Sequence, residues 1–284
     1  MANVKVDWVK YRDSFGPRCL GICKFNPPRP WGEWTKIMGV VARAEGKYDS
    51  VVMYDGTGVT ANFLQHTFTS GRLQLFLESL KSILVDKDDI HTNLYEDLKL
   101  ADKFAKFNFS ISSGKFYDIS KKQILNPAFP SQKKRIVDIC MMSKDSSLLL
   151  AKLFGEIGQD ERVQRAQELF GKSEFIHALD VVRNPLGEYK TIRNLLNDDW
   201  TTLCPALFFN LWQNSPAAAY KLFINARKES DANGTDLQSV VWRMLNRSSF
   251  ANWGWGSGNK SPRIIRIQSA IKEFYGIDLL FNKP

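Results

Sequence analysis

Residues 44–60 read AEGKYDSVVMYDGTGVT, and the rest of the chain is interpreted around them. Before this segment, apolar residues recur at three- and four-residue steps, and Gly46 is typical of a residue just past a helix end. Residues 50–54 are β-branched or apolar and predict a strand, residues 55–58 supply two glycines for a tight turn, and residues 59–63 predict a returning strand. The segment therefore predicts the end of a helix followed by a small antiparallel hairpin.

Helical patterns dominate the remainder of the chain. The predicted helices cover residues 31–45, 72–84, 98–107, 133–142, 146–154, 161–170, 174–182, 189–196, 204–226, 237–245 and 262–274. The proline cluster at 26–30 predicts an extended N-terminal lead-in over residues 1–30. Because so small a hairpin needs a helical body to pack against, we expect residues 31–284 to form one bilobed unit. The predicted class is mainly α (α+β), with a small β-hairpin lobe and a large helical lobe.

Composition excludes several classes of protein. The 284 residues carry 39 Lys+Arg against 30 Asp+Glu, a formal charge of +9, and 44% of them are hydrophobic, which is enough for a substantial core. No apolar run reaches the roughly 18 residues of a membrane span, and no secretory signal opens the chain. Four cysteines and three scattered histidines form no zinc pattern, and no phosphate-binding or dinucleotide motif occurs. We expect no metal and no cofactor.

Three residues of the segment suggest acid–base chemistry. Glu45 closes an apolar helix, where partial desolvation disfavours its charged form, while Asp55 lies at a turn whose amides and water keep it ionised. Thr60 follows five residues later with a hydroxyl that can position water. A protonated acid, an ionised base and a held water are what inverting glycoside hydrolysis requires. The alternatives are an exposed helix end for Glu45, an ordinary Asp-Gly turn for Asp55 and an ordinary strand residue for Thr60.

The order Glu-Gly, strand, Tyr-Asp, glycine turn and threonine resembles the active-site hairpin of phage-type lysozymes. The run from Asp55 to Ala61, continuing into Thr69-Ser-Gly71 and a helix, is also similar to the hairpin of lysozyme-fold chitosanases. Both belong to a lysozyme-like superfamily of polysaccharide hydrolases. The resemblance implies Glu45 as general acid, Asp55 as the carboxylate that activates or positions water, and Thr60 as a residue that holds this water.

Other residues are candidates for substrate contacts. The amides of Asn62 and Gln65 could bind sugar groups, and Trp253 and Trp255 on a glycine-rich loop could stack on sugar rings. The alternatives are strand residues that face water and a loop anchored by two packed tryptophans. Asp49 is a competing carboxylate, which we expect at the surface.

The resemblance implies a peptidoglycan hydrolase, a muramidase-like glycosidase that cleaves the glycan strands of the bacterial cell wall. We expect a phage-encoded, inverting and monomeric lysozyme or endolysin, made without a signal peptide in the cytoplasm of an infected host and acting on the wall or carried in the virion. Its partner would be peptidoglycan, with no nucleic acid expected. A charge of +9 suits anionic envelope polymers better than the polycation chitosan, so a chitosanase-like enzyme comes second. A third possibility is a non-catalytic helical virion or binding protein that retains the hairpin.

Overall fold

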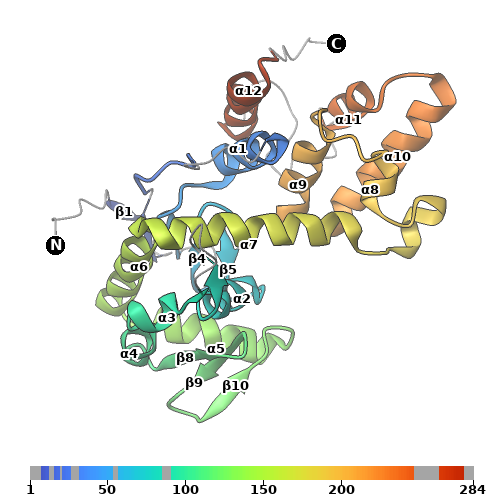
Figure 1. The fold of residues 1–284 in the computed structure, drawn as a ribbon. Helices are drawn as coiled ribbons and strands as arrows, with labels where there is room; N and C mark the ends of the chain where they lie inside the picture. Colours follow the sequence, from blue (N-terminus) through green and yellow to red (C-terminus); the bar gives the residue numbers. More distant parts are fainter. Residues whose placement is uncertain are drawn as a thin grey trace. The chain divides into compact units, whose positions relative to one another are not determined.

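Helices make up most of the chain, and small antiparallel sheets occupy its first half (Figure 1). The structure is a computed structural model that describes residues 8–12, 16–19, 21–26, 32–53, 57–84, 91–245 and 262–277. Internal contacts divide the chain into two units. Unit 1 comprises residues 1–25 and 46–171, and unit 2 comprises residues 26–45 and 172–284. The mainly α class predicted from the sequence is confirmed.

The predicted hairpin is part of a five-stranded antiparallel sheet in unit 1, in which each strand pairs with the next along the chain. The strands are β1 (Trp8–Arg12), β2 (Gly16–Cys19), β3 (Val51–Val52), β4 (Thr60–Ala61) and β5 (His66–Thr67). Val52 pairs with Thr60 and Val51 with Ala61, so the two predicted strands pair as an antiparallel hairpin. The first two strands lie within residues 1–30, the segment predicted as a lead-in, and they complete the sheet.

Unit 1 also contains a second, three-stranded sheet that the sequence analysis missed. Its strands are β8 (Phe109–Ser112), β9 (Lys115–Asp118) and β10 (Gln123–Leu125). Apolar residues alternate along them, and Ser113 and Gly114 make the first turn with positive φ angles. The remaining elements of this unit are α2 (Arg72–Ser79), β6 (Ile83–Leu84), β7 (His91–Thr92), α3 (Leu94–Asp97), α4 (Leu100–Ala105), α5 (Pro130–Cys140) and α6 (Lys144–Gln159).

Phenylalanine rings fill the core of unit 1. The Phe68 ring meets those of Phe109, Phe116 and Phe154 edge-on at 5.1–5.8 Å between centroids. Phe104 stacks on Phe109 at 5.0 Å. Burial of several such rings outweighs the conformational entropy lost by these short elements, so the core holds strands that would be unstable alone.

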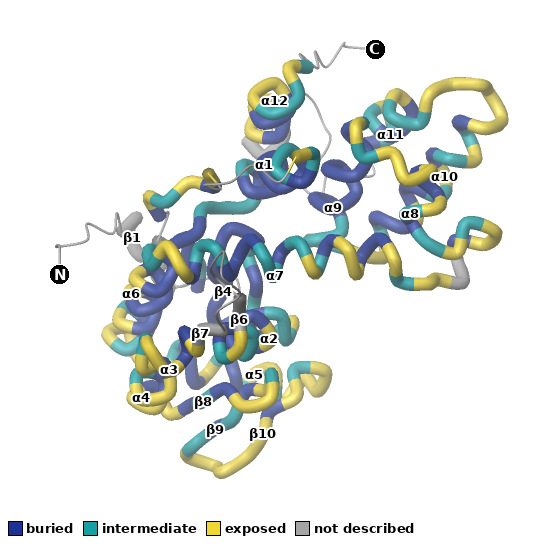
Figure 2. The backbone as a smooth tube through the Cα atoms, in the orientation of Figure 1, coloured by how far each residue is buried: buried dark blue, intermediate teal, exposed yellow. Residues whose placement is uncertain are grey.

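Among the described residues of unit 2, the regular elements are all helices. Its elements are α1 (Glu33–Glu45), the 3-10 helix η1 (Asn184–Tyr189), α8 (Ile192–Leu195), α9 (Cys204–Asn214), α10 (Pro216–Asn233), α11 (Leu237–Leu245) and α12 (Pro262–Tyr275). Helix α1 packs against α9 and α12, and α10 packs against α9 and α11. Helix α9 is buried along most of its length (Figure 2), so it forms the centre of this unit.

Several helix boundaries differ from the prediction. The helix predicted over residues 72–84 ends at Ser79, and Ile83–Leu84 form strand β6 instead. Residues 161–170 and 174–182 belong to one helix, α7 (Glu161–Asp180), because the glycine between them is tolerated within a helix. The predicted helix over 204–226 breaks at Ser215-Pro216, where the Ser215 hydroxyl accepts a hydrogen bond from the Ala218 amide and starts α10.

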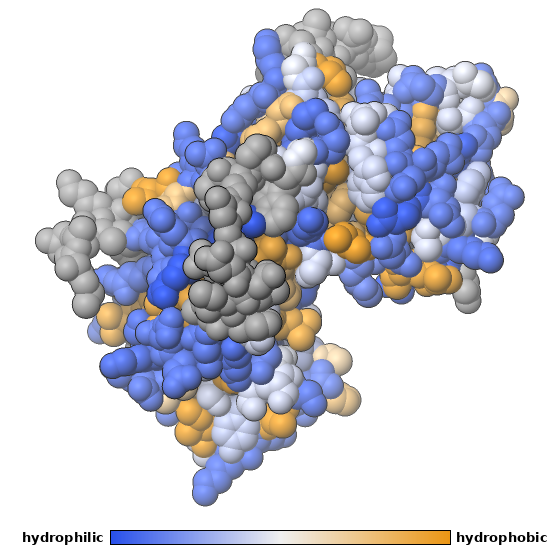
Figure 3. Space-filling view, viewed as in Figure 1, coloured by the Kyte–Doolittle hydropathy of each residue, from blue (hydrophilic) through white to orange (hydrophobic). Residues whose placement is uncertain are grey.

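No helix among the described residues is long and apolar enough to cross a bilayer. On the face shown in Figure 3, hydrophilic residues predominate and apolar side chains are scattered between them.

Candidate functional site

The β3–β4 hairpin presents Thr60 as a buried strand residue. Only 4% of Thr60 is exposed, and its Oγ1 shares a hydrogen bond of 2.7 Å with Oγ1 of Thr57. Thr57 belongs to the turn that carries Asp55, while Asp55 itself lies outside the described residues. The turn therefore orients the Thr60 hydroxyl through a side chain that the sequence analysis did not select.

Glu45 is the last residue of α1 and is half-buried. Nδ2 of Asn214, at the end of α9, donates to Oε1 of Glu45 at 3.0 Å and to the backbone oxygen of Asn210 at 3.1 Å. The amide is thus anchored by its own helix and sets the direction of the Glu45 carboxyl group. Asn214 is separated from Glu45 by 169 residues, and no local pattern in the sequence points to it.

Asn62 and Gln65 hold the turn between β4 and β5. Asn62 is 4% exposed; its Oδ1 accepts from the Leu64 amide at 3.0 Å, and its Nδ2 lies 2.9 Å from Nδ1 of His66. Nε2 of Gln65 donates to the backbone oxygen of Asn62 at 3.1 Å. Both residues have positive φ angles, which such local hydrogen bonds help to stabilise. Their role in sugar binding stays a prediction, as does that of Trp253 and Trp255, which lie outside the described residues.

Asp49 is buried, and the expectation of a surface position is wrong. It is 1% exposed, and its carboxylate accepts from the amides of Ile22 and Cys23 at 2.9 Å and from Nε2 of Gln159 at 3.0 Å. Gly21 has a positive φ, and a Cβ there would lie 2.3 Å from the Asp49 carboxylate. The carboxylate thus ties the N-terminal segment to α6, a contact between distant residues that a sequence pattern does not show.

Cys23, Cys140 and Cys204 are poor nucleophiles. Burial, reinforced by the negative charge of Asp49, raises the pKa of Cys23 to about 11. Burial raises the pKa of Cys204 to about 12, and burial likewise raises that of Cys140. Since the thiolate is the reactive form, these thiols stay inert near neutral pH. Within the described residues no group of three or more His, Cys, Asp or Glu side chains is arranged to hold a metal ion.

A second buried carboxylate of unit 1, besides that of Asp49, belongs to Glu168. The Tyr48 hydroxyl donates to Oε1 of Glu168 on α7, and Nη1 of Arg165 lies 2.9 Å from Oε2 of the same carboxylate. Tyr48 is 2% and Glu168 3% exposed. With all its oxygens engaged by neighbouring donors, Glu168 anchors the segment after α1 and is not the carboxylate we assign to chemistry.

No family model matches the chain, and neither the curated proteins nor the solved structures contain a match to it. The end of α1 and the β3–β4 hairpin are therefore the features from which we infer a function.

Proposed function

We propose that the chain is a lysozyme-like glycosidase with a bilobed fold that hydrolyses the glycan strands of bacterial peptidoglycan. The observation that supports it most is the order of elements around Glu45. Helix α1 belongs to unit 2 and ends at Glu45, the chain then enters unit 1 through the β3–β4 hairpin, and it returns to unit 2 within α7. A half-buried acid at a helix end, followed at once by a hairpin with an oriented hydroxyl, fits the resemblance noted above.

In the proposed reaction Glu45 donates its proton to the glycosidic oxygen as the bond to the anomeric carbon breaks. A water held by Asp55 and Thr60 attacks that carbon from the opposite face, and Asp55 takes the proton that the water loses. The hydrogen bond from Asn214 fixes the plane of the Glu45 carboxyl group and hence the direction of proton transfer. Asp55 then releases its proton to solvent and solvent returns a proton to Glu45, so the enzyme ends unchanged.

The setting that we propose follows from the same assignment. The enzyme is phage-encoded and monomeric, is made in the cytoplasm of an infected host, and acts on the cell wall or travels in the virion. A charge of +9 favours its encounter with anionic envelope polymers.

Digestion of purified peptidoglycan tests the proposal. Wild type and Glu45→Gln are compared by counting new reducing ends and by mass analysis of the fragments. We expect the variant to lose about two to four orders of magnitude in rate, which is the usual contribution of a general acid. Glu33→Gln is the matched control, because Glu33 lies at the other end of α1, where it pairs with Lys36 at 2.7 Å.

Three results would count against parts of the assignment. Full activity in Glu45→Gln would refute the catalytic role of this residue. Cleavage of chitosan but not of peptidoglycan would establish the chitosanase-like alternative. Cleavage of neither, together with salt-dependent binding of nucleic acid, would favour a non-catalytic protein that retains the hairpin.

A further inference from the structure

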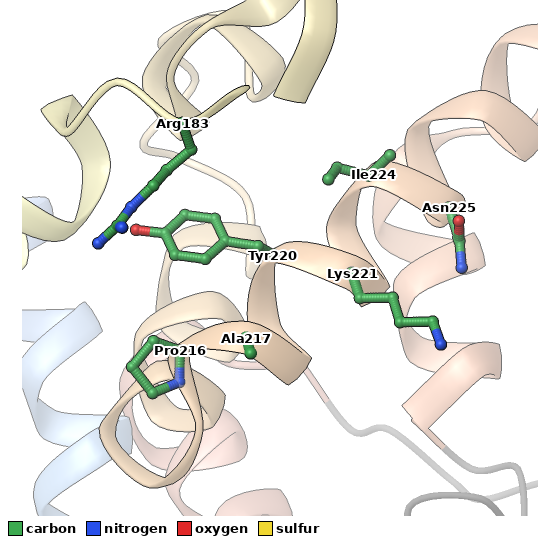
Figure 4. Close-up of a pocket in the computed structure, with 7 residues that line it drawn as sticks. All are labelled: Arg183, Pro216, Ala217, Tyr220, Lys221, Ile224 and Asn225. Atoms are coloured by element: carbon green, nitrogen blue, oxygen red, sulfur yellow. The ribbon is translucent and has the colours of Figure 1, made fainter. Parts of the chain in front are cut away.

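A pocket of about 570 Å³ lies in unit 2, and none of the residues that line it has a role in the reaction proposed above. Two rows of residues on α10, each spaced by four positions, form one wall (Figure 4). Pro216, Tyr220 and Ile224 make one row, and Ala217 and Lys221 belong to the other. Such a volume falls within the range typical of small-molecule sites.

The inner surface of the pocket is mainly apolar. Tyr220 is 7% exposed, and its hydroxyl donates to the backbone oxygen of Ala178 on α7 at 3.2 Å. Its polar end is thereby satisfied within the protein, and its ring offers an apolar face. Pro216, Ala217 and Ile224 add aliphatic surface. An occupant would consequently be held largely by its apolar portion.

Two cations accompany this apolar lining. Arg183 follows α7, and its guanidinium carbon lies 5.5 Å from the centroid of the Tyr220 ring. Lys221 extends from α10 on the other side of Tyr220 (Figure 4). Among the residues that line the pocket there is no carboxylate.

Other arginines of unit 2 differ from Arg183 in their partners. Arg193 pairs with Asp180, and Arg227 pairs with Asp231. Within the described part of the chain, neither Arg183 nor Lys221 forms an ion pair with a carboxylate. The positive charge at the pocket is therefore available to an anion from outside.

We propose that this pocket binds a small amphipathic carboxylate, an aromatic or branched aliphatic group that carries a single acid function. The apolar group packs on Tyr220, Ile224 and Pro216. The carboxylate accepts the two parallel hydrogen bonds that a guanidinium can donate, from Arg183, with Lys221 adding positive charge. This site is separate from the proposed glycosidase chemistry.

Methyl NMR on the full-length chain tests the proposal with 4-phenylbutyrate as the probe. We expect saturable shifts of the Ile224 methyl signal, which is assigned by its loss in Ile224→Val. The neutral amide of the same acid should bind at least about tenfold more weakly, and acetate should give no saturable shift, because the site needs both charge and apolar surface.

Arg183→Gln should weaken binding of 4-phenylbutyrate about tenfold or more without lowering the melting temperature. Arg227→Gln is the matched control. Arg227 lies on α10, outside the pocket, and like Arg183 it lies over an aromatic ring, 5.9 Å from the Tyr189 centroid. Equal binding of acid and amide, equal losses in the two arginine variants, or no saturable shift in wild type would each overturn the proposal. Glu45→Gln should bind the probe as wild type does, so this outcome is independent of the glycosidase test.

Discussion

The two units differ in how far the carboxylates that join residues distant in sequence are buried. In unit 1 the carboxylates of Asp49, Asp118 and Glu168 are at most 3% exposed, and amides or arginines bind them. In unit 2 the carboxylates of the ion pairs are partly exposed, as in Arg193–Asp180, where Asp180 is 43% exposed. Among the described residues, every fully buried carboxylate lies in unit 1. Removing one partner of an ion pair with a buried carboxylate in unit 1 should therefore destabilise the protein more than breaking a pair of similar geometry in unit 2.

The largest effect is expected for Asp49→Ala. Loss of this carboxylate leaves two backbone amides and the Gln159 amide without their acceptor, and each such donor costs about 1–3 kcal/mol, so we expect unit 1 to lose about 3–4 kcal/mol. Hydrogen exchange followed by mass spectrometry should show faster exchange in β2 and α6. Asp231→Ala, which removes an exposed carboxylate of unit 2, is the control; if both variants gave the same small change, the contrast between the units would fail.

A glycine within a helix of each unit contacts a different kind of neighbour, backbone in unit 1 and a side chain in unit 2. A Cβ on Gly158 of α6 would lie 2.4 Å from the backbone oxygen of Tyr48, whereas a Cβ on Gly39 of α1 would lie 2.4 Å from the Phe274 ring. Alanine gains about 1 kcal/mol of helix propensity at either position. Because backbone cannot move aside as a ring can, we expect Gly158→Ala to cost about 2 kcal/mol net and Gly39→Ala about 1 kcal/mol.

Chemical denaturation measures both costs, and a second substitution separates their causes. Phe274→Leu should restore stability to Gly39→Ala by removing the ring. Truncating Tyr48 should not do so for Gly158→Ala, because the clash is with the main chain. Rescue in both cases, or in neither, would contradict this explanation.

The ion pair between Asp118 and Arg135 makes the stability of unit 1 depend on pH. Burial alone would raise the pKa of the Asp118 carboxyl, but hydrogen bonds from Arg135, Ser120 and the Lys121 amide together hold this pKa below its ordinary value of 3.8. The unfolded chain therefore takes up the proton first as the pH falls. The stabilisation is complete well above pH 3.8 and is lost as the pH drops through the lower pKa of the folded state.

Urea titrations between pH 2 and 6 should show that the free energy of unfolding falls less at acidic pH in Asp118→Asn than in wild type. Arg135→Gln should cost about 1–2 kcal/mol at neutral pH, which is typical for hydrogen bonds to a charged group. Asp138→Asn is the control, because Asp138 pairs with Lys134 at the surface. An unchanged pH profile in Asp118→Asn would show that other carboxylates govern acid unfolding.

The smallest effect is expected at Arg193 in unit 2. Its guanidinium binds Asp180 through Nε at 2.6 Å and Nη2 at 3.0 Å, and reaches Asp198 at 2.9 Å. The pairs are partly exposed, so Arg193→Gln should cost only about 0.5–1 kcal/mol, and less as salt screens them. Thermal unfolding at low and high salt measures this. A loss above 2 kcal/mol that salt does not change would place Arg193 with the buried pairs of unit 1.

Sequence patterns predicted those elements whose signals are local. The apolar spacing of α1 and the β-branched residues of the hairpin are both signals carried by residues close together in the chain. The second sheet was missed because its strands are short and its alternation is carried by few residues, such as Phe109, Ile111 and Phe116. Asn214 and the buried Asp49 could not be predicted, since their partners are brought to them only by tertiary packing.

The division of unit 2 along the chain has a consequence for its synthesis. Helix α1 leaves the ribosome early, yet the Arg43 guanidinium binds Glu273, which is 230 residues later. At about 5–20 residues per second, α1 waits on the order of 10–50 seconds for α12. Until α9 and then α12 have been made, the face of α1 that packs against them in the folded chain lacks these partners. The nascent α1 is thus open to a chaperone for longer than a helix whose partners are its neighbours in sequence.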